Sequence, residues 1–185
     1  MPARDDQLSD ADLVALANRG DAAGFEGLYA RYRGWVAALA LRFTGDDALA
    51  LDVTQDTFMY LLGKFPGFKL TARMTTFLYP AVKNLSIAAR RKARRLSGSP
   101  DEVLAALPAQ AGGPGALEHQ DLLAVVAALP DIHREVVLMR FVDDFSLDEI
   151  GQALGIPTGT IKSRLHHAIA ALREDPEVRK HFVAE

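Results

Sequence analysis

The sequence predicts an all-α protein made of two small helical domains joined by a flexible linker. Three observations support this fold class. Apolar residues recur at spacings of three and four along most of the chain, whereas the alternating pattern of strands is scarce. Capping residues and Gly or Pro residues divide the periodic stretches into separate helices. Between residues 97 and 117 the composition shifts toward Pro and Gly, as is typical of a linker.

The first predicted domain, residues 8–96, begins with three helices. Ser9 and Asp21 have side chains that cap helix N-termini, so a helix is expected to follow each of them. A turn at 44–46 separates the second helix from the third. The first helix is expected to end near Arg19, the second near Phe43 and the third near Gly63.

A cation-rich loop and a fourth helix complete this domain. The loop, residues 64–75, contains Pro and Gly and is not expected to be helical. The fourth helix is expected from about Thr76 to Arg95. Because Pro80 lies inside it and lacks a backbone donor, this residue should kink the helix or delay its regular start.

The second predicted domain, residues 118–175, follows the linker of residues 97–117. A helix over 118–129 is expected to break at Pro130, and a second helix is expected over 131–142. A pair of helices joined by a tight turn then occupies the rest of the domain.

This pair, from Ser146 to Leu172, has the pattern of a helix-turn-helix. Ser146 and Glu149 form a capping box that starts its first helix, and Gly155 ends that helix. Thr158 can cap the second helix, which is apolar on one face and carries basic and polar side chains on the other. That polar face suits a DNA major groove, although a plain helical hairpin with a solvated face fits the pattern equally well.

Composition narrows the function classes. The 185-residue chain has no Cys and no apolar run of membrane-spanning length, and its first ten residues are polar and acidic. A cytoplasmic protein without disulfides, thiolate metal sites or a signal peptide is therefore expected. Residues 57–100 hold nine of the 21 basic residues and none of the 24 acidic ones. This segregation indicates a polyanion site, although a basic run by itself can be a solvated helix end.

Two groups of motifs resemble one family. The segment GTIKSRLHHA, residues 159–168, is similar to the recognition helix of bacterial sigma factors of the extracytoplasmic-function type, and residues 129–157 resemble the rest of their region 4. The segment DVTQDTFMYLL, residues 52–62, resembles region 2.2, and residues 75–95 resemble regions 2.3 and 2.4. The resemblance covers nearly the whole chain except the tails and the linker.

The third helix is implied by this resemblance to bind the clamp coiled coil of RNA polymerase. Steps of about 100° per residue divide it into two sides. One side holds Ala50, Thr54, Thr57, Phe58 and Leu61. The opposite side is the predicted polymerase-binding face; its residues are Leu49, Asp52, Gln55, Asp56 and Met59.

The loop and the fourth helix are implied to open and bind the −10 promoter element. An extruded base can be held by aromatic and amide groups, which offset the cost of unstacking, while cations neutralise phosphates. The family usually has Trp where this chain has Phe77, and often Asp where it has Ala88. The predicted −10 residues are Lys69, Arg73, Phe77, Asn84, Arg90, Arg91 and Arg94.

The second helix of the helix-turn-helix is implied to bind the −35 element. Lysine can donate to guanine acceptors, and serine adapts to several bases. The family often has Arg where this chain has His167, so the −35 sequence does not follow from the resemblance. The two adjacent His are rejected as metal ligands because they point about 100° apart. The predicted base contacts are Lys162, Ser163, His166 and His167, and the predicted phosphate contacts are Thr160 and Arg164.

One departure from the family suggests a form of regulation. Its acidic signature at the start of region 2.2 is replaced here by Leu49-Ala50-Leu51-Asp52, which has lost two of three carboxylates. Asp52 and Asp56 can suffice for binding, with Leu49 making an apolar contact. Alternatively, phosphorylation of Thr54 or Thr57 by a Ser/Thr kinase could supply the missing charge, because a phosphate brings about −1.5 to −2 charges. The helical wheel argues against this hypothesis, since it places both threonines toward the core.

The predicted function is therefore that of a sigma factor that binds polymerase core and starts transcription at specific promoters. Its expected partners are the clamp and flap of RNA polymerase, promoter DNA, and an anti-sigma factor or a kinase. The alternative is a helix-turn-helix repressor or activator that does not bind polymerase core. No cofactor is expected, and an enzyme is disfavoured because the sequence has no phosphate-binding Gly loop, nucleophile motif or metal-ligand spacing.

Overall fold

The computed structural model describes residues 8–97 and 125–175, which consist of helices and the connections between them, without any β-strand. The predicted all-α fold is therefore confirmed. The chain divides into two compact units, one within Met1–Ala106 and the other within Leu107–Glu185. Apart from Ser97, the predicted linker lies outside the described residues, as do residues 118–124 of the expected helix. No described helix is long and apolar enough to span a membrane.

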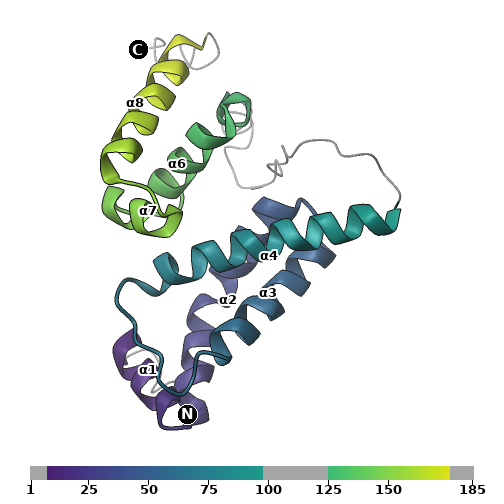
Figure 1. The fold of residues 1–185 in the computed structure, drawn as a ribbon, viewed down its shortest axis with the longest axis vertical. Coiled ribbons are helices and arrows are strands. Elements are labelled where there is room, and N and C mark those ends of the chain that lie inside the picture. The colour runs from purple at the N-terminus through teal and green to yellow at the C-terminus, as the bar shows by residue number, and fades with distance from the viewer. Residues whose placement is uncertain (1–7, 98–124, 176–185) are drawn as a thin grey trace, which may run out of the picture. The chain divides into compact units, whose positions relative to one another are not determined.

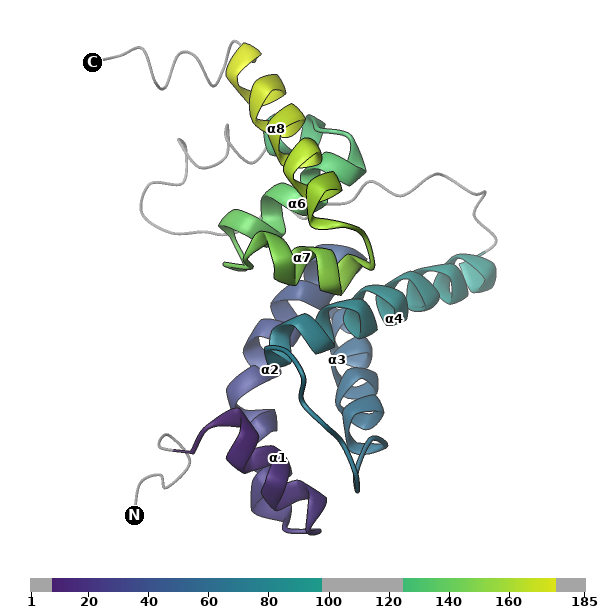
Figure 2. The same ribbon diagram turned by 60° about the vertical axis from the view of Figure 1, so that its left-hand side comes forward.

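The first unit is a bundle of four helices around α2 (Figure 1). Helix α2 packs against each of the others, and α3 also packs against α4. The long connection between α3 and α4 runs back toward α1, as both Figure 1 and Figure 2 show. The helices are α1 (Asp10–Asn18), α2 (Ala22–Thr44), α3 (Asp47–Leu62) and α4 (Met74–Ser97).

Local capping signals set the boundaries of the first three helices. Ser9 forms a capping box with Asp12, and Asp21 accepts a hydrogen bond from the backbone of Ala23. Gly45 ends α2 in the left-handed conformation at φ 69°, and Asp46 then caps α3 by accepting from Leu49 N–H. Each of these three helices ends within a residue of its predicted end.

Helix α1 is held against α2 by two close approaches. A Cβ on Gly24 would lie 2.4 Å from the backbone nitrogen of Ala17, and one on Gly27 would lie 2.6 Å from a methyl of Leu13. Only glycine therefore fits at Gly24, where the obstacle is backbone. Arg31 and Tyr32 of α2 also donate hydrogen bonds to Asp10. Burial and this bond raise the pKa of the Tyr32 hydroxyl, which stays protonated as a donor.

Helix α4 contains Pro80 as predicted, but Pro80 does not delay the start of the helix, which was one of its two expected effects. The helix begins at Met74, before Pro80, and continues through it to Ser97. The missing N–H of Pro80 costs one backbone hydrogen bond. Met74, Leu78 and Val82 are completely buried on either side of Pro80. Burial of large apolar side chains is worth about 1.5–3 kcal/mol each, which outweighs that loss.

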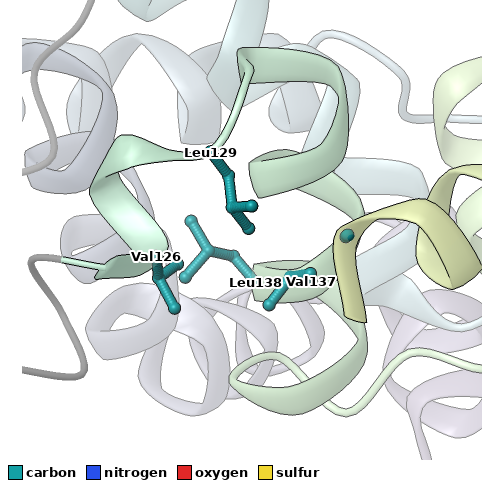
Figure 3. Packing of buried hydrophobic residues seen from close by; sticks show 5 residues of the cluster. Val126, Leu129, Val137 and Leu138 are labelled. Atoms are coloured by element: carbon teal, nitrogen blue, oxygen red, sulfur yellow. The ribbon is translucent and has the colours of Figure 1, made fainter. Parts of the chain in front are cut away.

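The second unit contains a helical segment over residues 125–128 and three further helices, α6 (Asp131–Phe141), α7 (Leu147–Leu154) and α8 (Thr158–Glu174). Its core joins Val126, Leu129, Val137 and Leu138 to Ala168 of α8 (Figure 3). The predicted break at Pro130 is confirmed, because α6 begins directly after it.

Arg134 fixes the chain around this break. Its guanidinium donates to the carbonyl oxygens of Ala127 and Leu129 and forms an ion pair with Asp131. The orphaned carbonyls at the end of the preceding helical segment are satisfied in this way.

Candidate functional surfaces

The helix-turn-helix has the geometry that its capping signals predict. Ser146 N–H donates to Glu149 Oε2 at 2.8 Å, and Glu149 N–H donates to Ser146 Oγ at 3.2 Å, which completes the capping box of α7. Gly155 ends α7 at φ 68°, a conformation that strongly favours glycine. The turn is tight, because a Cβ on Gly151 would lie 2.9 Å from the carbonyl oxygen of Ile156.

The predicted cap of α8 is wrong. Pro157 occupies the N-cap position and makes no side-chain cap bond, and Thr158 is the first residue of the helix. The Thr158 hydroxyl instead donates to Asp148 Oδ1 at 2.8 Å. Proline is pre-organised for this position by its fixed φ, so threonine is free to link α8 to α7.

Helix α8 divides into the two faces that its sequence predicts. Ile161 and Ala168 are completely buried, and Leu165 and Leu172 pack against the core cluster. The proposed −35 residues lie on the other side. All are exposed except Arg164, which is half-buried; they are Thr160, Lys162, Ser163, Arg164, His166 and His167. Helix α8 therefore presents a continuous polar surface of the kind that enters a major groove.

A histidine of α6 contacts this surface, a contact that the sequence did not indicate. The ring of His133 stacks on the ring of His167, with centroids 6.1 Å apart and an interplanar angle of 20°. His166 meets His167 edge-on at 5.7 Å. Within residues 8–97 and 125–175, no group of three or more His, Cys, Asp or Glu is placed to hold a metal ion.

Helix α3 shows the predicted division into a buried and an exposed side. Ala50, Thr54, Thr57, Phe58 and Leu61 are all buried. Leu49 is half-buried, whereas Asp52, Gln55 and Asp56 are exposed and Met59 keeps 65% of its surface. The exposed residues form one contiguous strip that mixes carboxylates with apolar side chains.

The phosphorylation hypothesis is not supported by this structure. Thr57 is completely buried and Thr54 is 7% exposed. Both hydroxyls donate to carbonyl oxygens one turn back, Thr54 to Ala50 and Thr57 to Val53, at 2.7 Å each. A kinase could not reach either hydroxyl in the folded helix, and a buried phosphate dianion would carry a large desolvation cost.

The predicted −10 surface contains an aromatic cluster at the start of α4. Phe77 is half-buried, stacks on Tyr60 with centroids 6.0 Å apart, and meets Phe68 at 4.7 Å. Lys64 lies over the Tyr60 ring, 4.4 Å from its centroid. Tyr60 and Lys64 extend the set of aromatic and cationic groups beyond those that the sequence singled out.

The cations of this surface have different environments. Lys69, Arg73 and Arg91 are exposed, as is Asn84, whereas Arg94 is half-buried. Arg90 is also half-buried and donates to the carbonyl oxygen of Phe43 at 3.0 Å. Burial and the nearby Arg94 lower the pKa of Arg90. Arg90 thus ties α4 to the end of α2, a role that the sequence did not predict.

Asn18, at the end of α1, holds the loop that leads into α4. Its Oδ1 accepts from Gly67 N–H at 2.7 Å and from Phe68 N–H at 2.9 Å, and its Nδ2 donates to the Phe68 carbonyl at 2.9 Å. No local sequence signal marks this contact, because the partners are 49 and 50 residues apart.

Both units match known sequence families. Residues 28–96 match the family "Sigma-70 region 2", and residues 125–174 match "Sigma-70, region 4". The chain is 34% identical over 166 residues to the ECF RNA polymerase sigma factor SigL of Mycobacterium tuberculosis, covering 86% of this chain and 93% of that protein. It is 29% identical over 179 residues to SigW of Bacillus subtilis, covering 87% and 93%.

Two solved structures share the fold. The sigma factor RpoE of Bartonella quintana, solved with the anti-sigma factor NepR, aligns with a TM-score of 0.61 at 24% identity over 87% of this chain and 98% of that one. CnrH, solved with the cytosolic domain of CnrY, aligns with a TM-score of 0.62 at 22% identity over 95% and 98%.

A region 2 unit followed by a region 4 unit defines a sigma-70-type transcription initiation factor. The chain belongs to the extracytoplasmic-function (ECF) family of RNA polymerase sigma factors. Its function is to direct transcription initiation, and it is not an enzyme. Membership in this family decides against the alternative of a repressor or activator that works without polymerase core.

Proposed function

We propose that this sigma factor docks on the clamp of RNA polymerase core through the exposed face of α3. The face consists of Leu49, Asp52, Gln55, Asp56 and Met59. The exposure of Asp52, Gln55, Asp56 and Met59 opposite the buried side of α3 is the observation that carries the proposal. Two carboxylates suit cations on the partner, and Leu49 makes an apolar contact where the family usually has an acid, so binding needs no added phosphate.

For the −10 element, we propose capture of an unpaired base by the loop of residues 64–75 together with Asn84. Phe77 supports this pocket from within the aromatic cluster, where its ring contacts those of Tyr60 and Phe68. The cations near the pocket would neutralise phosphates. They are Lys69, Arg73, Arg91 and Arg94. Arg90 would also contribute, through the guanidinium N–H groups that do not donate to the Phe43 carbonyl.

For the −35 element, we propose that α8 enters the major groove. Lys162, Ser163, His166 and His167 would contact base edges, while Thr160 and Arg164 would contact phosphates. Their exposure along one side of α8 supports this assignment. We also propose functional boundaries of 8–96 for region 2, 97–117 for the segment that joins the two regions, and 118–175 for region 4, which would bind the polymerase flap as well as DNA.

An anti-sigma factor is the regulator that we propose in place of a kinase. The similar sigma factor RpoE of Bartonella quintana was solved in complex with the anti-sigma factor NepR. The burial of Thr54 and Thr57 removes the physical basis for the kinase. We expect the protein to act in the cytoplasm, where polymerase core is found.

Core binding tests the docking proposal directly. Charge reversal at Asp52 and Asp56, as Asp52→Arg with Asp56→Arg, should weaken binding to purified polymerase core by about tenfold or more. Glu26→Arg is the matched control, because Glu26 is an exposed acid on α2. Equal binding by the double variant, the control and the wild type would remove α3 from the interface.

A further inference from the structure

The connection between α3 and α4 is anchored near its middle by one side chain from another helix. Asn18 accepts from two consecutive backbone N–H groups, of Gly67 and Phe68, and donates to the Phe68 carbonyl. Backbone groups in such a connection have no helix or strand partners, so each of these bonds restricts the loop. In both Figure 1 and Figure 2 this connection runs past α1, which carries Asn18.

The anchor itself is rigid. Asn18 is the last residue of α1, and Gly24 of α2 approaches the backbone of that helix so closely that no side chain fits between them. Leu13 of α1 is completely buried at the same contact. The packing of α1 on α2 therefore fixes the position of Asn18, and Asn18 in turn fixes the position of the loop.

The loop residues that Asn18 binds, Gly67 and Phe68, are next to the groups of the proposed base pocket. Phe68 is buried, meets Phe65 at 5.5 Å and meets Phe77 at 4.7 Å. The next residue, Lys69, is exposed. Asn18 thus fixes the backbone where the loop turns from the aromatic cluster toward its exposed, cationic half.

We propose that Asn18 is a positioning residue for −10 base capture, which makes α1 a determinant of promoter opening. The inference rests on the proposed function of the loop and Asn84. Without the hydrogen bonds from Asn18, the loop would have to become ordered when the base is captured. That loss of conformational entropy would oppose base binding. Asn18 lies outside the segment that matches the region 2 family, which begins at residue 28.

The test uses the complete chain bound to polymerase core and a fluorescent single-stranded oligonucleotide carrying a −10 sequence at which this factor initiates. Abasic substitutions are moved through the oligonucleotide to find the position whose base contributes most to wild-type affinity. Asn18→Ala removes all three hydrogen bonds to the loop and should weaken binding of the intact oligonucleotide by about tenfold, because the loop must then become ordered on binding. It should bind the abasic oligonucleotide as the wild type does, because no base is captured there.

Two further variants refine this test. Arg19→Ala is the matched control, because Arg19 is the exposed neighbour of Asn18; it should behave as the wild type. Asn18→Asp keeps an acceptor for the two N–H groups but cannot donate to the Phe68 carbonyl, so its loss should be intermediate. If Asn18→Ala does not fold, Asn18→Asp carries the comparison, and discrimination equal to wild type overturns the inference.

The outcomes separate the inference from the function on which it rests. If the wild type binds intact and abasic oligonucleotides equally at every position, base capture itself fails. If the wild type and Asn84→Ala differ but Asn18→Ala discriminates like the wild type, only the role of Asn18 fails. Hydrogen exchange adds a direct check, since the Gly67 and Phe68 amides should exchange faster in Asn18→Ala while those of α2 stay unchanged.

Discussion

Replacement of Thr57 by Val should leave this sigma factor folded and active, whereas replacement by Glu should strongly destabilise region 2. The two substitutions distinguish core binding that needs no modification from core binding that depends on phosphorylation, which the burial of the threonines contradicts. Thr57 is completely buried, and its hydroxyl donates to the Val53 carbonyl within the same helix.

The expected magnitudes follow from this environment. Valine has nearly the shape of threonine, and loss of a neutral hydrogen bond of about 1 kcal/mol is offset because no hydroxyl remains to be buried. Thr57→Val should therefore change the free energy of unfolding by less than about 1 kcal/mol. Glutamate would bury an unpaired charge at a cost of about 3–5 kcal/mol. For a domain of this size, each kcal/mol lowers Tm by about 4–8 °C, so a fall of at least about 12 °C is expected.

Fluorescence of Trp35 provides the assay. This residue is the single Trp of the chain and lies in α2, so its thermal transition reports on region 2. Core binding and transcription by Thr54→Val and Thr57→Val should equal those of the wild type without any kinase. If a folded Val variant lost core binding and the corresponding Glu variant restored it, the argument from burial would be refuted.

Three other perturbations test the packing and the −35 surface. Gly24→Ala should destabilise region 2 by more than about 2 kcal/mol in the Trp35 transition, because its Cβ would strike the backbone of α1. Gly34→Ala, with open space around its Cβ, is the control and should be neutral or stabilising. Arg134→Ala should lower the stability of region 4 by about 2–3 kcal/mol by circular dichroism, and Arg134→Lys should not rescue it, because lysine cannot reproduce the guanidinium fork. His167→Ala should alter base preference at one or two positions of a randomised −35 library by about 1–3 kcal/mol each; unchanged selectivity would remove His167 from base contact.

The sequence predicted those parts of the fold that depend on neighbouring residues. Ser9, Asp21 and Ser146 cap helices as expected, because a capping side chain bonds to backbone only two or three residues away. The division of α3 into two sides was also predictable, since helical periodicity alone fixes which residues share a face. Gly155 ended α7 for the same kind of local reason.

Contacts between distant segments were not predictable in this way. The early start of α4 depends on core burial around Pro80, and local rules for proline do not include that burial. Asn18, Arg90 and His133 each act on a residue from another helix or loop, and no spacing in the sequence connects them. The wheel placed Thr57 toward the core, and the degree of its burial then decided against phosphorylation.

Run-off transcription with purified polymerase core shows whether this protein acts as an initiation factor. Core alone and the chain alone should give no specific transcript, and the two together should start transcription at defined promoters that carry matched −35 and −10 elements. Asp52→Arg with Asp56→Arg should abolish these transcripts, whereas Glu26→Arg should preserve them. If the chain bound promoter DNA tightly without core and no specific transcript appeared when core was added, the account of this protein as an initiation factor would be contradicted.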